Sequence, residues 1–108
     1  MSPPLSKASK VFTALANGTR CRIVARLIEG ERSVGVLASL LQLRQSDVSN
    51  HLAVLRKAGL VSTARQGRFV FYRLAERHGS LVRALWDGLG LSSDPTLAAD
   101  AWRAAAGN

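Results

Sequence analysis

The segment from Gln45 to Lys57 carries short polar side chains at a spacing suited to entering a polyanionic groove. On a helix of 3.6 residues per turn, its apolar residues share one face: Val48, Leu52 and Leu55. Small or polar residues fall on the other side: Ser46, Ser49, Asn50, Ala53 and Lys57. An Asn amide can pair bidentately with an adenine edge, and a Ser hydroxyl can bond a base or a phosphate. The pattern predicts a helix whose outer face meets nucleic acid.

Basic side chains lie within this segment and on both sides of it. Five of them are suited to phosphate contacts that position a protein on a duplex: Arg44, Arg56, Lys57, Arg65 and Arg68. The last two flank Gln66-Gly67, which we predict to be the tip of a hairpin. An arginine at such a tip can also enter a minor groove.

The composition of the chain favours an anionic partner. Its 108 residues amount to one domain, 1–108, and carry 15 Lys and Arg against 7 acidic residues, a formal net charge of +8. Nucleic acid or an anionic membrane surface are the leading partners, and a generally basic protein without such a partner is the alternative. No apolar run reaches the roughly 20 residues of a membrane span. The single cysteine, Cys21, fits a reducing cytoplasm, so we expect a cytoplasmic protein.

Helical periodicity predicts two helices in the N-terminal part of the chain and two in the C-terminal part. The first covers Lys7 to Ala16, and the second follows Thr19 as its N-cap and ends near Gly30. A fifth helix begins at about Gly79, and Asp94-Pro95 starts the last one.

Between them lie two further helices and a hairpin. Ser33 is the expected N-cap of a helix through Leu41, and a polar turn near residues 42–45 leads to the helix described first. Strands are expected at residues 61–64 and 69–74, with Gly67 able to take a positive φ.

The resulting order is α-α-α-α-β-β-α-α, mainly α with a β-hairpin wing. We assign residues 33–58 to a helix-turn-helix and 61–74 to the wing of a winged helix-turn-helix fold. The terminal helices, 6–30 and 77–106, are strongly apolar for a small chain, so we expect them to form a homodimer. The expected interface residues are Val11, Phe12, Leu81, Leu85, Trp86 and Leu89.

Four blocks of sequence resemble the bacterial ArsR/SmtB-type transcriptional repressors, over about Phe12 to Leu89. They are ALANGTRCRIVARL, SVGVLASLL, QSDVSNHLAVLRKAGLV and GRFVFYRL. The resemblance implies a homodimer that binds a palindromic double-stranded DNA operator and usually leaves it when a metal ion or redox signal arrives. It also implies that DNA is read by the start of the fourth helix, here Gln45, Ser46, Ser49 and Asn50. Many members have His at the position of Asn50, so the operator can differ.

The metal sites of this family are only partly matched. A cysteine-containing site at the third helix corresponds here to residues 31–35, where Ser33 and Gly35 replace both thiolates. A soft-metal site for arsenic, lead or cadmium is therefore not expected there. At the second family site, Glu76 and His78 match the first half, but the second half falls on Leu89 and Ser92.

Two readings of Glu76 and His78 stay open. They can hold a borderline metal such as nickel or zinc, with Asp87 and Asp94 as further oxygen ligands, or they can simply cap and solvate the fifth helix. A lone cysteine usually behaves as a small hydrophobe, so Cys21 is expected to pack rather than to sense redox state. His51 is expected to pack or contact a phosphate rather than to read a base or hold a metal.

The leading hypothesis is a sequence-specific repressor, and three alternatives remain. They are a metal-independent regulator controlled by a partner protein, a non-specific architectural DNA-binding protein, and a protein-interaction module. The amide side chains at Gln45 and Asn50 argue against the architectural protein, because phosphate binding alone would favour Lys and Arg there. An enzyme is not expected, since no nucleophile, base or phosphate-binding loop stands at a usable spacing.

Overall fold

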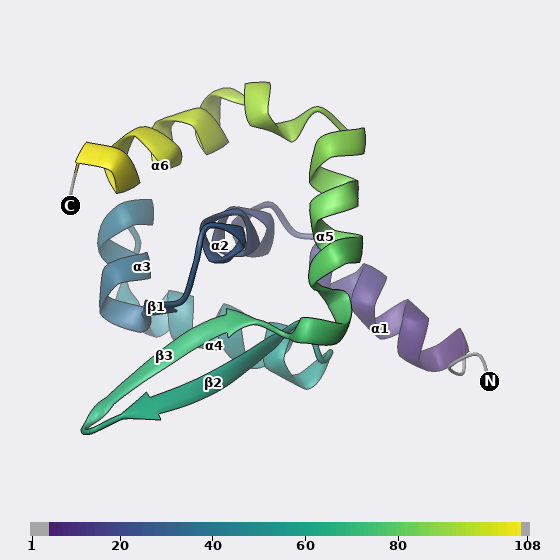
Figure 1. Cartoon of the computed structure of the whole chain (residues 1–108), viewed down its shortest axis with the longest axis horizontal. Coiled ribbons are helices and arrows are strands. Elements are labelled where there is room, and N and C mark those ends of the chain that lie inside the picture. The colour runs from purple at the N-terminus through teal and green to yellow at the C-terminus, as the bar shows by residue number, and fades with distance from the viewer. Residues whose placement is uncertain (1–4, 107–108) are drawn as a thin grey trace.

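The computed structural model describes residues 5–106, apart from the side chain of Ser92. Its elements are α1 (Leu5–Leu15), α2 (Gly18–Ile28), β1 (Arg32–Ser33), α3 (Val34–Leu41), α4 (Gln45–Lys57), β2 (Val61–Gln66), β3 (Phe69–Leu74), α5 (Glu76–Gly88), the 3-10 helix η1 (Leu91–Ser93) and α6 (Pro95–Ala106). The predicted helical architecture with a hairpin wing is confirmed (Figure 1). None of the described helices is long and apolar enough to cross a membrane.

Helix α2 forms the centre of the molecule. Figure 1 shows it nearly end-on, with α3 and α5 on opposite sides and α6 and the sheet along the other two. Ile23 and Val24 of α2 are fully buried, together with Leu37 and Leu41 of α3. This placement means that α2 contacts both the helix-turn-helix and the terminal helices.

The apolar face predicted for the fourth helix is confirmed. Val48, Leu52 and Leu55 of α4 are all 0% exposed. They pack into one core cluster with residues of α1, α2, α3 and α5. Because that face is fully used for packing, the orientation of the opposite face is fixed.

The predicted two-stranded sheet was incomplete, because β1 adds a third strand. The strand order is β1-β3-β2, with Arg32 opposite Tyr72 and Ser33 opposite Phe71. Ser33 is also the N-cap of α3, as predicted: its hydroxyl accepts a hydrogen bond from the Val36 N–H at 3.2 Å. At the other end of the wing Gly67 has a φ of 63°, the left-handed conformation expected there.

Several predicted boundaries were wrong. The N-cap of α2 is Asn17 rather than Thr19, because the Asn17 side chain accepts the Arg20 N–H at 3.0 Å. Helix α1 begins at Leu5, two residues before the predicted start, and α5 begins at Glu76, not near Gly79. Strand β2 runs on to Gln66. The Asp94 cap is confirmed, since its carboxylate accepts the backbone N–H groups of residues 96 and 97.

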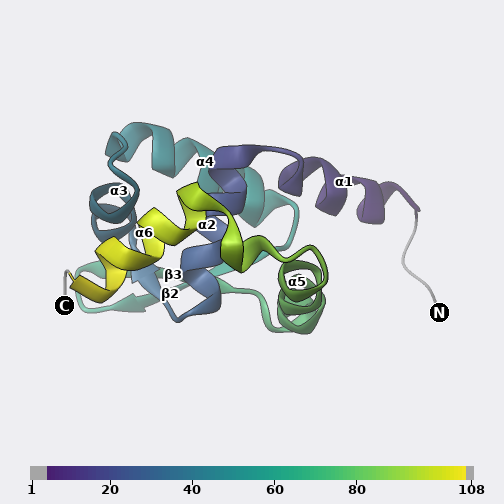
Figure 2. The same ribbon diagram turned by 90° about the horizontal axis from the view of Figure 1, so that it is seen from above.

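A buried carboxylate attaches α6 to the helices below it. Asp100 is 0% exposed and accepts two hydrogen bonds of 2.9 Å from Arg22 and one from Arg103. The same two arginines donate to the carbonyl oxygens of Leu41 and Leu40, in the last turn of α3. Figure 2 shows α6 lying across α2 toward α3. Arg103 of α6 and Arg22 of α2 therefore supply partners for α3 carbonyls that have none within their own helix.

Candidate nucleic-acid interface

The outer face of α4 is exposed along its length. The predicted base-contacting residues all lie on it as exposed side chains: Gln45, Ser46, Ser49 and Asn50. Helix α4 begins at Gln45 with Arg44 in the capping position, and no side-chain hydrogen bond caps it. The Ser46 hydroxyl is therefore not used as an N-cap and is free to face a ligand.

The end of α4 and the wing enclose a shared hollow. It has a volume of about 440 Å³ and is lined by Ser49, Ala53, Arg56, Lys57 and Tyr72. The first four residues come from the outer face of α4, and Tyr72 comes from the middle of β3. The helix and the wing thus form one continuous surface.

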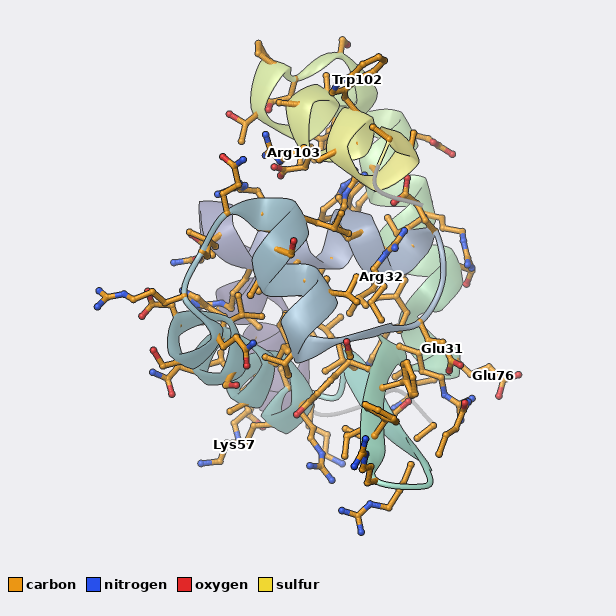
Figure 3. All side chains as sticks on the ribbon, turned by 90° about the vertical axis from the view of Figure 1, so that its left-hand side faces the viewer. Glu31, Arg32, Lys57, Glu76, Trp102 and Arg103 are labelled. Atoms are coloured by element: carbon orange, nitrogen blue, oxygen red, sulfur yellow. The ribbon has the colours of Figure 1, made fainter. Side chains whose placement is uncertain are left out.

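Arg56 and Lys57 line this hollow. The predicted phosphate-contacting residues are all exposed: Arg44, Arg56, Lys57, Arg65 and Arg68. Lys57 points outward from the end of α4 (Figure 3). Arg44 lies 3.5 Å from Asp47, but both side chains are exposed, so this ion pair restrains Arg44 only weakly. Arg68 lies over the ring of Phe69, 5.4 Å from its centroid, which holds the guanidinium near the tip of the wing.

His51 faces α2 rather than the outer surface. It is half-buried, and its Nδ1 accepts a hydrogen bond of 3.4 Å from Arg20. Arg20 also donates to the Ala14 carbonyl oxygen at 2.6 Å, at the end of α1. His51 therefore joins α4 to α1 and α2, which agrees with the packing role expected for it.

Glu76 and His78 both lie in the first turn of α5. Glu76 is exposed and points away from the molecule (Figure 3). His78 packs over the turn after α4, where a Cβ on Gly59 would lie 3.9 Å from its Nε2. Within residues 5–106, no group of three His, Cys, Asp or Glu side chains could hold a metal ion. One protomer thus offers at most two candidate ligands here.

The Cys21 thiol lies in the packed region between α1 and α2. Its Sγ donates to the Leu15 carbonyl oxygen at 3.1 Å. Burial raises the pKa of this thiol above its ordinary value, against the opposing effects of a backbone hydrogen bond at Asn17 and the charge of Arg20.

The residues expected at a dimer interface divide into three groups. Phe12, Leu81 and Leu89 are exposed, at 63%, 44% and 68% respectively. Leu85 and Trp86 are half-buried. Val11 is only 7% exposed and belongs to the core of the protomer itself. Figures 1 and 2 both show the N-terminal part of α1 projecting away from the other helices.

Two aromatic residues of this surface were not identified from the sequence. Tyr72 lines the hollow, and Phe69 supports Arg68. Both lie on β3, where the run of aromatic and β-branched residues indicated a strand but not which face each side chain would take. The pairing of Thr63 with Tyr72 and of Gln66 with Phe69 determines those faces, and it depends on the register of the hairpin.

Comparisons with known proteins agree with this geometry. Residues 17–63 match the family model described as bacterial regulatory protein, arsR family. The chain is 48% identical over 80 residues to the HTH-type transcriptional regulator CmtR of Mycobacterium tuberculosis. That match covers 74% of this chain and 66% of CmtR, just under two thirds of the relative. It is 38% identical over 108 residues to the arsenic resistance transcriptional regulator ArsR1 of Pseudomonas putida, covering 97% of this chain and 79% of that protein.

A solved structure shares the arrangement of helices and wing. It is the solution NMR structure of the homodimeric winged helix-turn-helix DNA-binding domain of Mb0332 from Mycobacterium bovis. The two are 32% identical, with a TM-score of 0.73 over 82% of each chain.

Proposed function

We propose that this chain, which belongs to the arsR family of bacterial regulatory proteins, acts in the cytoplasm as a homodimeric repressor that binds a palindromic DNA operator. It is a DNA-binding transcriptional regulator with a winged helix-turn-helix fold, not an enzyme. The proposal concerns three properties of the protein: the residues that recognise DNA, the dimer that it forms, and the signal to which it responds.

One observation carries this proposal: the outer face of α4 and the wing line a single hollow. Asn50 and Gln45, on the exposed face of α4, are suited to base edges in a major groove. The exposed cations of α4 and the wing are suited to phosphates, and their attraction supplies most of the affinity without supplying sequence information. Because the buried face of α4 fixes the orientation of this helix, the base-contacting and phosphate-contacting side chains keep a constant position relative to each other.

Two copies are needed for a palindromic site. In a two-fold dimer, the two α4 helices enter major grooves about one helical turn of DNA apart. The exposed apolar residues Phe12, Leu81 and Leu89 provide a surface that a second copy can bury. Mb0332, which shares the fold, is homodimeric, and this supports the same assembly here.

Asn50→Ala tests base reading. We expect the variant to lose about 1–3 kcal/mol of affinity for a fragment of its own upstream region, because a bidentate contact to a base is removed. Its affinity for random-sequence DNA should hardly change. Fluorescence anisotropy with both DNAs at one salt concentration measures the difference, and equal losses on the two would refute base reading by Asn50.

Arg68→Ala is the companion variant for phosphate contact. It should weaken binding to both DNAs and reduce the slope of log affinity against log salt concentration by about one unit. Lys7→Ala is the matched control, because it removes one exposed cation from α1, away from α4 and the wing. A slope that falls equally in the control would show that total charge, not the wing, determines the salt dependence.

A borderline metal such as nickel or zinc is the proposed signal, held by Glu76 and His78 with the remaining ligands from the second copy. CmtR has been described as a cadmium metal-sensor, which supports metal sensing in this family. A gel shift with nickel, with zinc and with a chelator should show release of DNA in one metal lane. His78→Ala should abolish that release. Asp94→Asn tests whether the more distant Asp94 carboxylate is a further metal ligand. Identical binding in all lanes would refute the metal site.

A further inference from the structure

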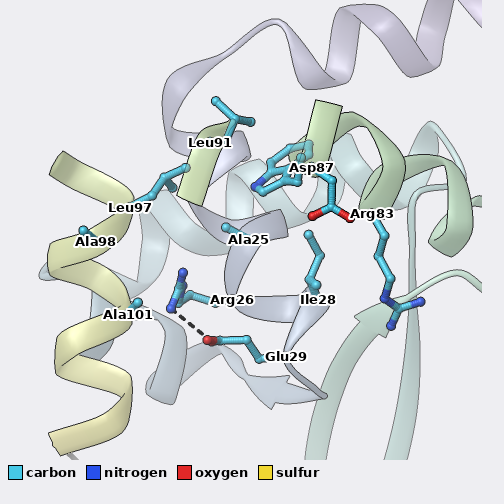
Figure 4. A pocket seen from close by; sticks show the side chains of 11 residues that line it. Ala25, Arg26, Ile28, Glu29, Arg83, Asp87, Leu91, Leu97, Ala98 and Ala101 are labelled. Carbon is cyan, nitrogen blue, oxygen red and sulfur yellow. Dashed lines mark hydrogen bonds and ion pairs between the residues drawn. The ribbon is translucent and has the colours of Figure 1, made fainter. Parts of the chain in front are cut away.

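A second cavity lies on the opposite side of α2 from the DNA-binding helix. It has a volume of about 370 Å³ and is formed by α2, α5, η1 and α6. Its walls are mainly apolar, and the apolar lining residues are Ala25, Ile28, Leu91, Leu97, Ala98 and Ala101. Figure 4 shows these side chains around it, with α6 forming one wall. Its volume is in the range of cavities that hold small molecules.

Two hydrogen-bond donors in the lining have no partner. Among the described residues, the only buried side-chain nitrogen or oxygen atoms without a hydrogen bond are Nε of Arg26 and Nε1 of Trp86. Both residues line this cavity. Leaving a buried donor unsatisfied costs about 1–3 kcal/mol, so such groups are rare unless something else supplies the acceptor.

The charged side chains of the lining balance one another, so the two unpartnered donors, and not net charge, favour an acceptor. Arg26 is 5% exposed, and its Nη1 forms an ion pair of 3.0 Å with Glu29. Arg32 also contacts the same Glu29 oxygen, at 3.2 Å, so this carboxylate is already shared between two cations. Arg32 is not part of the lining, whose second cation is Arg83. Glu29 and the exposed Asp87 are its two carboxylates, so the lining is formally neutral.

We propose that this cavity binds a small, mainly apolar molecule that carries one oxygen acceptor, either a carboxylate or an amide carbonyl. The apolar body packs against the alanine and leucine side chains of α6 and η1. Nε of Arg26 and Nε1 of Trp86 are buried in the cavity wall. On binding, one of these side chains turns so that its N–H donates to the ligand oxygen. This site lies outside the DNA-binding surface, and its occupation is independent of the proposed operator recognition.

The two tryptophans provide a direct test in the full-length protein. Trp86 lines the cavity, whereas Trp102 is 74% exposed on α6 and is not part of the lining. Each gives one indole N–H signal in a ¹H–¹⁵N spectrum, and a Trp102→Phe variant assigns them. The probes are phenylacetate, phenylacetamide and phenethylamine, which share an aromatic body. The first carries a charged acceptor, the second a neutral acceptor, and the third only donors.

We expect phenylacetate or phenylacetamide to shift the Trp86 indole signal saturably, with a dissociation constant of about 1 mM or tighter. The Trp102 signal should stay in place, and phenethylamine should cause no saturable shift. Comparing the two acceptor probes shows whether the preferred acceptor is charged or neutral.

Two variants locate the binding. Ala98→Phe fills the cavity from the exposed side of α6 and should weaken the better probe at least tenfold. Arg26→Met removes one donor and should weaken it severalfold. If Arg26→Met does not fold, Ala98→Phe alone decides. The proposal is overturned if neither acceptor probe shifts Trp86 at about 20 mM, if phenethylamine shifts it equally, or if Ala98→Phe leaves the affinity unchanged. Because no DNA is present, failure here leaves operator binding untouched.

Discussion

At the scale of single residues, Cys21 shows how surroundings determine chemistry. The thiolate is the reactive form of cysteine, and flanking cations such as Arg20 lower the pKa of an exposed thiol. Here burial has the larger effect and raises the pKa of Cys21, and the thiol donates to the Leu15 carbonyl oxygen. Cys21 is therefore held in its protonated form.

We expect iodoacetamide to alkylate Cys21 in the folded protein about tenfold more slowly than in urea at pH 7.5. The folded-state pKa lies above the unfolded one, so the thiol stabilises the fold fully below the unfolded pKa. That contribution is lost as the pH rises through the folded pKa, and the alkylation rate rises over the same interval. Mass spectrometry of timed samples measures both rates. Equal rates in native and denaturing buffer would contradict the assigned environment.

At the scale of elements, α6 is at the C-terminal end of the fold but is bonded directly to the helix-turn-helix. Arg22 and Arg103 connect Asp100 to the last carbonyl oxygens of α3. The turn between α3 and α4 follows directly, with Gln42 in a left-handed conformation at a φ of 57°. The position of α4 therefore depends on contacts made by α6.

Asp100→Asn should lower the free energy of unfolding by roughly 3 kcal/mol, because removing one member of a buried charge network leaves its partners uncompensated. Urea denaturation followed by circular dichroism measures this loss. Asp87→Asn is the control, since the same chemical change at an exposed carboxylate of α5 should cost less than about 0.5 kcal/mol. A similar small loss for both variants would show that the Asp100 network contributes little to stability.

Local pattern predicted some elements of this fold and missed others for identifiable reasons. The buried face of α4 and the N-caps Ser33 and Asp94 each depend on a few neighbouring residues, so the local sequence predicted all of them. Strand β1 has two residues, too few to show any alternation, and it exists because β3 offers it hydrogen bonds. Asn17 and Thr19 are both good N-caps, so sequence alone could not choose between them.

The candidate sites also differ in how far they could be predicted from the sequence. The outward residues of α4 follow from helical geometry, so their placement was predictable. The cavity beside α2 was not, because Arg26 and Trp86 are 60 positions apart and meet only through tertiary packing. Likewise, Asp100 lies 78 residues from Arg22, and no spacing in the sequence indicates that pair.

At the scale of the whole molecule, the exposed apolar residues of α1 and α5 determine the proposed assembly. Leu89→Glu should convert the dimer to a monomer, because the charge would have to be buried at the interface without a partner. Sedimentation velocity at several concentrations measures the change. Trp102→Ala is the control, since it removes a larger exposed apolar side chain from α6 and should leave the dimer intact. A dimer that survives Leu89→Glu but not Trp102→Ala would place the interface on α6 instead.

Ser33 belongs to two elements at once. It pairs with Phe71 at the base of the wing, and its hydroxyl begins α3. Because Ser33 is part of both, the wing and the start of α3 are held in a fixed relative orientation. In the proposed dimer, each protomer would therefore present α4 and the wing to DNA at a constant separation. On that proposal, we expect a signal that releases DNA to change the orientation of one protomer relative to the other, and not the geometry within a protomer.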